Sequence, residues 1–152
     1  MALTYADRVA VMPELFRAMM SCERYKMQAT KDWSRKKAVY AFFEGDVARH
    51  VGRTRNLEQR IRGHLANSHY SASFAFSQAR TELGIKPSYR KGEGRPALLL
   101  RADFRDAFDR QRSRLRSMEL RFVAIVDPLT QYLFELYAAM ELQTPLGEFE
   151  TS

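Results

Sequence analysis

The hydrophobic pattern of residues 37–64 predicts a strand, a second strand and a helix in succession. Residues 38–43 suit a strand with one buried face, and residues 47–52 form a second short run. Glu44-Gly45-Asp46 between them suits a three-residue hairpin loop. A turn centred on Gly45 places Phe43 opposite Val47 and Tyr40 opposite His50. Directly opposed residues share a sheet face with Cβ atoms roughly 4.5–5.5 Å apart, so we expect a phenol beside an imidazole.

The helix that follows is predicted over residues 57–65. Asn56 is a good N-cap, and Gln59 three residues later resembles a capping box. Arg60 and His64 are four apart and therefore share one face at the edge of the apolar stripe. A simpler interpretation stays open, in which Arg60 only lies along the core with its charge in water and His64 is an ordinary interfacial residue. The stripe itself repeats every four residues: Leu57, Ile61, Leu65.

These residues, in this order, resemble the GIY-YIG nuclease superfamily over about residues 37–151. The resemblance rests first on two short motifs separated by nine intervening residues, Ala38-Val39-Tyr40 and His50-Val51-Gly52. Arg60 and His64 follow them, and Glu135 lies within a later predicted helix. It implies an α+β fold with a small three-stranded, mainly antiparallel sheet flanked by helices. It also implies a metal-dependent endonuclease that hydrolyses phosphodiester bonds in DNA.

Three positions depart from the family pattern. Ala38 replaces the first glycine, His50 stands where the second motif usually has tyrosine, and Gly147 occupies the place where asparagine is expected. The second and third changes alter polar positions. They leave a second hypothesis open, in which the domain is a catalytically degenerate nucleic-acid-binding module or regulator.

Phosphodiester hydrolysis needs an activated water, a base and charge stabilisation on the phosphoryl oxygens. The resemblance assigns Tyr40 to positioning or deprotonating the water and Glu135 to holding Mg²⁺ or Mn²⁺, although periodicity alone makes Glu135 a solvated residue. Arg60 can bind the scissile phosphate with a planar set of donors. A histidine titrates near neutrality, so His50 can serve as base, while His64 orients phosphate or shares the proton relay.

The charge distribution favours a polyanionic partner. Residues 31–64 carry nine basic and four acidic groups, residues 86–121 carry eleven and five, and residues 122–152 carry none and five. A basic surface is typical of nucleic-acid binding, so we expect DNA as the partner, without excluding RNA; a merely solvated basic face is the alternative. The expected nucleic-acid-binding residues are Arg53, Arg55, Lys91, Arg95, Arg101 and Arg105.

The remaining segments predict one globular unit, with residues 1–36 as an N-terminal helical extension packed on a nuclease-like domain of residues 37–152. A helix over about residues 5–22 should break or restart at Pro13. A second helix over residues 71–80 should begin with a serine cap. A basic insertion should contain a long helix over residues 98–118, with arginines on its outer face. Residues 122–126 predict a central strand covered on both faces.

Asp127 and Pro128 should cap and open the last helix. Its predicted buried stripe is Leu129, Tyr132, Leu133, Leu136, Tyr137 and Met140.

The composition and the length of the apolar runs indicate the cellular compartment and the kinds of covalent or metal site that we expect. One cysteine excludes an internal disulfide and fits a reducing compartment. The apolar runs are too short for a signal peptide or a membrane span, so we expect a cytoplasmic protein, either monomer or homodimer. Three histidines within twenty residues lack the ligand number and spacing of a zinc site.

Overall fold

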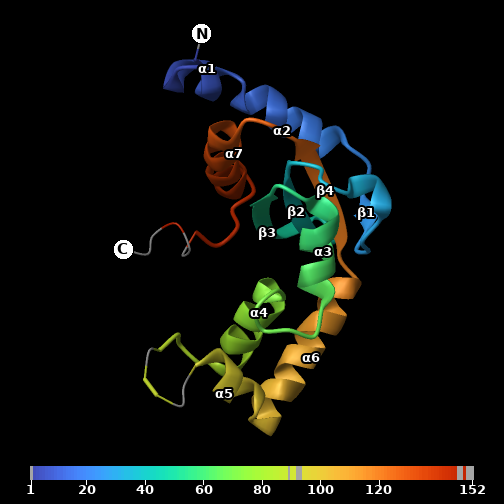
Figure 1. The fold of residues 1–152 in the computed structure, drawn as a ribbon, viewed down its shortest axis with the longest axis vertical. Helices are drawn as coiled ribbons and strands as arrows, with labels where there is room; N and C mark the ends of the chain where they lie inside the picture. Colours follow the sequence, from blue (N-terminus) through green and yellow to red (C-terminus); the bar gives the residue numbers. More distant parts are fainter. Residues whose placement is uncertain (1, 89, 92–93, 147–148, 150–152) are drawn as a thin grey trace.

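The computed structural model describes residues 2–88, 90–91, 94–146 and 149, and it shows an α+β fold (Figure 1). The prediction of that class is confirmed, but the predicted three strands are wrong in number. The sheet has four, in the order β1 (Tyr25–Lys26), β4 (Glu119–Ala124), β2 (Ala38–Glu44) and β3 (Val47–Thr54), and every neighbouring pair is antiparallel. Two residues are too few to show a period, which is why β1 escaped the sequence pattern.

The β2–β3 hairpin forms where predicted, but its register differs. Glu44 pairs with Val47, so the loop has two residues and not three. Its first residue, Gly45, has a φ of +62°, a conformation that glycine adopts without steric cost. A bulge at Phe42/Phe43 then shifts the pairing. Phe43 faces Ala48 instead of the predicted Val47.

The same shift corrects the prediction at the centre of the hairpin. Tyr40 faces Gly52, and His50 faces Phe42. Residues two apart on a strand point to the same face. Tyr40 and His50 are therefore diagonal neighbours on one face, not a directly opposed pair.

The two faces of the sheet are covered by different helices (Figure 1). On the Tyr40 face, Leu57 and Ile61 of α3 (Leu57–Leu65) pack against Tyr40 and Phe42. Asn56 caps α3 by accepting a hydrogen bond from the Gln59 amide, as predicted. The short 3₁₀ helix η1 (Lys31–Trp33) covers the same face through Trp33.

On the other face lie α2 (Met12–Ser21) and α7 (Pro128–Glu141). The predicted break near Pro13 is confirmed, because α1 (Tyr5–Ala10) ends and α2 restarts at Met12. Arg8 of α1 donates to Asp127 at 2.9 Å, and Asp127 also caps α7 as predicted. Residues 2–36 thus supply two α-helices, the 3₁₀ helix η1 and strand β1.

Helix α7 buries a stripe that overlaps only in part with the one predicted: Leu133 and Tyr137 are partly buried against the core of this face. Leu129, Tyr132 and Met140 are more than half exposed, while Phe134, Ala138 and Ala139 are buried against the sheet. The two alanines permit close approach of the helix backbone to the strands. Because the helix is turned this way, Glu135 lies at the border of the buried side, and its side chain is only 15% exposed. The expectation from periodicity that Glu135 is solvated is therefore wrong.

Residues 66–118 contain a helical lobe inserted between α3 and β4. It consists of α4 (Ser73–Leu83), α5 (Arg95–Leu99) and α6 (Ala102–Arg116), which share a core of alanine, leucine and phenylalanine. The predicted long helix is in fact two, separated near Leu100. The predicted serine cap of α4 is also wrong, because the N-cap is Ala72 and makes no side-chain cap.

The outer face predicted for α6 is only partly correct. Arg112 is 13% exposed and donates to the Leu65 carbonyl. Arg114 joins the lobe to the hairpin through two 2.8 Å hydrogen bonds to the Glu44 carboxylate. That contact, mainly hydrogen bonding from Arg114, lowers the pKa of Glu44 to about 2. Strand β4 begins three residues earlier than expected and ends at Ala124.

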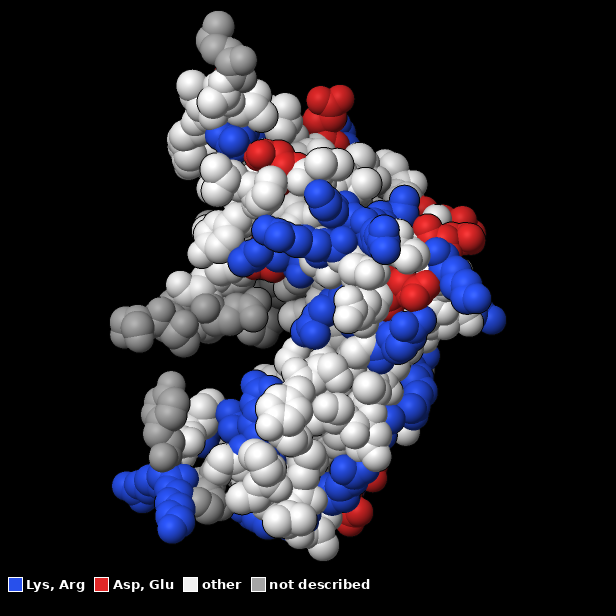
Figure 2. Space-filling model, viewed as in Figure 1, with Lys and Arg blue, Asp and Glu red and all other residues white. Residues whose placement is uncertain are grey.

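Among the described residues, no helix combines the length and apolar character needed to cross a membrane. Lys and Arg side chains form a band over the sheet lobe and a second group over the helical lobe, and the surface is hollowed between the two (Figure 2).

Candidate functional site

Tyr40 lies at the centre of the Tyr40 face and is held there by the absence of a side chain at Gly52. Tyr40 is 1% exposed. A Cβ built on Gly52 would lie 2.4 Å from Tyr40 Oη and 2.5 Å from its Cζ, far inside van der Waals contact. The glycine of the His50-Val51-Gly52 motif therefore has a steric role: it lets the phenol ring lie across β3.

Tyr40, Arg60 and His64 form a hydrogen-bonded chain between β2 and α3. Tyr40 Oη lies 2.9 Å from His64 Nε2, and Arg60 Nε donates to Tyr40 Oη at 3.3 Å. Arg60 also donates to the Ser71 carbonyl at 3.2 Å and to Ser73 Oγ at 2.7 Å. The guanidinium is therefore fixed from three directions.

His50 completes this group, which we call the Tyr40 cluster: Tyr40, His50, Arg60 and His64. The His50 ring centroid lies 6.0 Å from that of Tyr40 and 5.5 Å from that of His64. Phe42 packs against both histidines, and Phe74 packs against His50. The structure brings together these four residues, which were singled out from the sequence.

The surroundings of the two histidines favour their neutral forms. Burial among aromatic rings, and secondarily the charge of Arg60, lowers the pKa of His50 to about 4. His64 is fully buried, and desolvation, followed by the proximity of His50 and Arg60, holds its pKa well below the usual range. His64 Nδ1 has no hydrogen-bond partner among the described residues. Both imidazoles are therefore neutral at pH 7.

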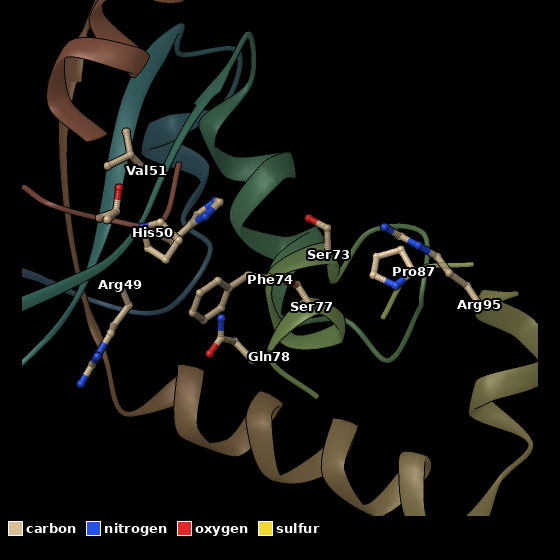
Figure 3. Close-up of a pocket in the computed structure, with 11 residues that line it drawn as sticks. Arg49, His50, Val51, Ser73, Phe74, Ser77, Gln78, Pro87 and Arg95 are labelled. Carbon is tan, nitrogen blue, oxygen red and sulfur yellow. The ribbon is translucent and has the colours of Figure 1, made fainter. Parts of the chain in front are cut away.

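A cavity of about 490 Å³ lies beside the Tyr40 cluster, between β3 and α4. Figure 3 shows His50 on the β3 side and Ser73, Ser77 and Gln78 on the α4 side, with Arg95 further along the wall. His50 is thus the member of the cluster that lines this space together with Ser73, the hydrogen-bond partner of Arg60. A volume of this size is in the range of sites that hold small ligands or single nucleotides.

Glu135 lies apart from the Tyr40 cluster, on the opposite face of the sheet. It comes from α7, which packs on the face carrying Val39 and Val51. Its Oε1 is 3.7 Å from Arg53 Nε, and the Arg53 guanidinium lies 4.8 Å from the centroid of the Tyr132 ring. The sequence had placed Arg53 among nucleic-acid contacts and had not paired it with Glu135.

The donor set for a metal is small. No group of three or more His, Cys, Asp or Glu side chains suited to a metal occurs among the residues that the structure describes. One carboxylate is still compatible with Mg²⁺, because this ion keeps several waters and takes one or two carboxylates together with substrate phosphate. Glu135, half-enclosed and bordered by Arg53, meets that minimal requirement. Gly147, the position where asparagine was expected, lies outside the described residues.

The other predicted nucleic-acid contacts are dispersed. Arg55 and Lys91 are exposed. Arg101 pairs with Asp103 at 2.8 Å, and Arg95 and Arg105 donate to the segment between α3 and α4. Sequence reasoning missed Ser71 and Ser73, whose contacts with Arg60 depend on a tertiary approach of α4 to α3 that no local pattern encodes.

Neither a protein-family model, nor a curated protein, nor a solved structure matches this chain significantly.

Proposed function

We propose that this protein hydrolyses phosphodiester bonds in nucleic acid, with DNA as the substrate, by chemistry of the GIY-YIG type. The observation that supports this most is the hydrogen-bonded chain Arg60–Tyr40–His64 with His50 beside it at a cavity wall. An arginine fixed in place, a phenol and two neutral imidazoles provide phosphate binding and proton transfer in one site.

The proton positions proposed for this chain follow from one choice of tautomer. Tyr40 Oη accepts from Arg60, and we assign its own hydrogen to a bond donated to His64 Nε2, which puts the hydrogen of His64 on Nδ1. This chain orients the phenol and polarises it. His50 lines the cavity and is neutral, so it is the residue that accepts the proton of an attacking water.

Arg60 binds the non-bridging oxygens of the scissile phosphate. A guanidinium has five N–H groups, and the three hydrogen bonds described above leave capacity for a phosphate oxygen. Glu135 would hold Mg²⁺ or Mn²⁺, which would supply charge neutralisation for the phosphate. Because Glu135 and the Tyr40 cluster lie on opposite faces of the sheet, the ion and a phosphate at Arg60 would meet only around the edge strand β3, and Arg53 would balance the carboxylate when no metal is bound.

A second function, a nucleic-acid-binding module without catalysis, is favoured by one specific observation. Tyr40 and His64 are 1% and 0% exposed, and the carboxylate expected to bind metal is paired with Arg53. In such a module the Tyr40 cluster would be structural, and binding would depend on phosphate contacts and therefore on salt.

A cleavage assay on supercoiled plasmid with Mg²⁺ and Mn²⁺ distinguishes the two functions. For the nuclease, Arg60→Ala should lower the cleavage rate at least 100-fold, on the order of the loss of one transition-state donor. Arg62→Ala is the matched control, since Arg62 is 63% exposed and pairs with Glu58 on the outer side of α3.

The same assay tests Glu135. Glu135→Gln should abolish metal-dependent cleavage, whereas Glu141→Gln, an exposed position on the same helix, should not. Absence of cleavage by the wild-type protein with every metal, together with binding that is insensitive to EDTA, would reject the nuclease and support the binding module.

A further inference from the structure

The segment between α3 and α4, residues 66–72, is held by an unusual number of arginines; we call it the α3–α4 loop. Its own contacts include hydrogen bonds from the Ala72 amide to the Ser68 carbonyl and from the Tyr70 amide to Ser68 Oγ. Three arginine side chains donate hydrogen bonds to the loop: Arg60 to the Ser71 carbonyl, Arg95 to the His69 carbonyl, and Arg105 to Asn67 Oδ1. A fourth, Arg112, donates to the carbonyl of Leu65, the last residue of α3.

This loop presents an aromatic side chain to solvent. Tyr70 is 80% exposed. The His69 ring lies behind it, with centroids 4.0 Å apart and an interplanar angle of 39°. A single exposed tyrosine is common on protein surfaces. Here the exposed tyrosine is backed by a second ring on a loop that three arginines hold, with a fourth at the end of α3. Such a loop is a rigid stacking surface, because the cost of ordering it has already been met in the free protein.

The loop also adjoins the candidate site through two residues. Arg60, a member of the Tyr40 cluster, holds Ser71, the residue after Tyr70. Arg95 holds His69 and lines the cavity next to His50. The residue after Tyr70 thus contacts the guanidinium to which we assign the scissile phosphate, so a nucleotide chain bound at Arg60 lies next to the α3–α4 loop.

We propose that Tyr70, supported by His69, stacks on an unpaired nucleobase next to the phosphate held at Arg60, so that the preferred substrate is single-stranded or locally unpaired nucleic acid. The inference rests on the proposed nucleic-acid substrate. Every base offers a flat π face, so such a contact is tolerant of sequence but requires a base outside the duplex stack. DNA and RNA strands share this chemistry and are separated by the test.

The test measures the affinity of 2-aminopurine-labelled single strands, as DNA and as RNA, and of the matched duplexes. Tyr70→Ala should weaken single-strand binding roughly 10-fold, within the 5- to 150-fold range that corresponds to about 1–3 kcal/mol for one stacked base. Tyr70→Phe should keep wild-type affinity. Tyr5→Ala is the matched control, because Tyr5 is 71% exposed on the distant α1.

A stacking contact has two further signatures. Tyr70→Ala should lose most of the 2-aminopurine quenching, and it should leave the slope of log K against log salt unchanged, since no phosphate contact is removed. The proposal is overturned if Tyr70→Ala binds single strands as tightly as the wild type does. It is also overturned if Tyr70→Ala loses affinity for duplexes and for single strands by the same factor. Tyr70-dependent binding without any cleavage supports it while rejecting the nuclease, and a wild-type protein that binds no nucleic acid overturns both.

Discussion

The two faces of the β2–β3 hairpin carry polar groups that are held in very different ways. On one face, Tyr40 and His64 are almost completely excluded from solvent and lie 2.9 Å apart. On the other, Arg53 and Glu135 meet at 3.7 Å, with Arg53 44% exposed. Two consecutive residues of one strand, Gly52 and Arg53, therefore serve a rigid buried network and a loose ion pair.

The difference has energetic consequences. Buried hydrogen bonds cannot be replaced by water, so removing one partner leaves the other unsatisfied. An ion pair at the surface is screened and contributes about 0–1 kcal/mol. The Tyr40 face therefore maintains geometry, whereas the pair between Arg53 and Glu135 is long and is exposed on its arginine side.

The largest effect should come from Gly52→Ala, which breaks the packing of the Tyr40 face without removing a polar group. The new methyl overlaps the phenol of Tyr40, so the ring must move, and we expect the free energy of unfolding to fall by about 3 kcal/mol. Denaturant titration measures this. Gly94→Ala is the matched control, since its Cβ meets only Pro96 at 3.9 Å. Equal stability of the two variants would show that Tyr40 has room to move.

Acid should destabilise the Tyr40 face next most strongly. The pKa of His50 is about 4 in the folded protein and near 6.5 when unfolded, so only the unfolded state gains a proton between these values. Stability is therefore full above pH 6.5 and is lost as the pH falls towards 4. We expect a loss of roughly 2 kcal/mol from His50, discounted for its partial exposure, with His64 acting in the same direction.

Urea unfolding at a series of pH values tests this, and His50→Gln should flatten the dependence between pH 6.5 and 4. A stability that stays constant over this window in the wild type would mean that both imidazoles take up protons as readily in the folded state as in the unfolded state.

Tyr40→Phe should have an intermediate effect. It removes one hydroxyl and leaves His64 Nε2 buried without that partner, at a cost of about 1–2 kcal/mol in the free energy of unfolding. The ¹⁵N shifts of the His64 ring should change with it, because the tautomer is no longer fixed by the phenol. Unchanged His64 shifts in a folded Tyr40→Phe protein would contradict the proton assignment made above.

The smallest effect is expected on the opposite face. Arg53→Gln should change stability by less than about 0.5 kcal/mol, because the pair with Glu135 is long and partly solvated. Thermal unfolding beside Tyr40→Phe makes the comparison direct. A loss from Arg53→Gln as large as that from Tyr40→Phe would remove the distinction between the two faces.

At three helix boundaries, local signals in the sequence were accurate. Asn56, Asp127 and Pro13 marked helix boundaries correctly because capping and ring geometry act within one turn. The shared face of Arg60 and His64 likewise followed from helical spacing. Tyr40 and His50 came to one sheet face despite the register error, because a shift by two residues preserves the alternation.

Several of the failures depended on tertiary packing. The bulge that moved the register has no marker in the local pattern. The small side chains of Ala138 and Ala139 fit α7 closely onto the sheet and turned its larger residues outward. Arg95 and Arg105 also donate to the α3–α4 loop, a contact that the sequence does not reveal, and their expected role at phosphates stays a prediction.

The two lobes are connected by shared helices as well as by chain. Helix α4 places Phe74 in the core beneath the sheet and Phe76 in the core of the helical lobe, and α6 does the same with Leu115 and Phe108. A hinge needs a few residues that can change dihedral angles between separately packed bodies. Here α4 and α6 both cross the junction without a break, so we expect the distance between β3 and α4 to be fixed. Selection among nucleic-acid strands at this site would then depend on which strand fits a preset opening, and not on closure around it.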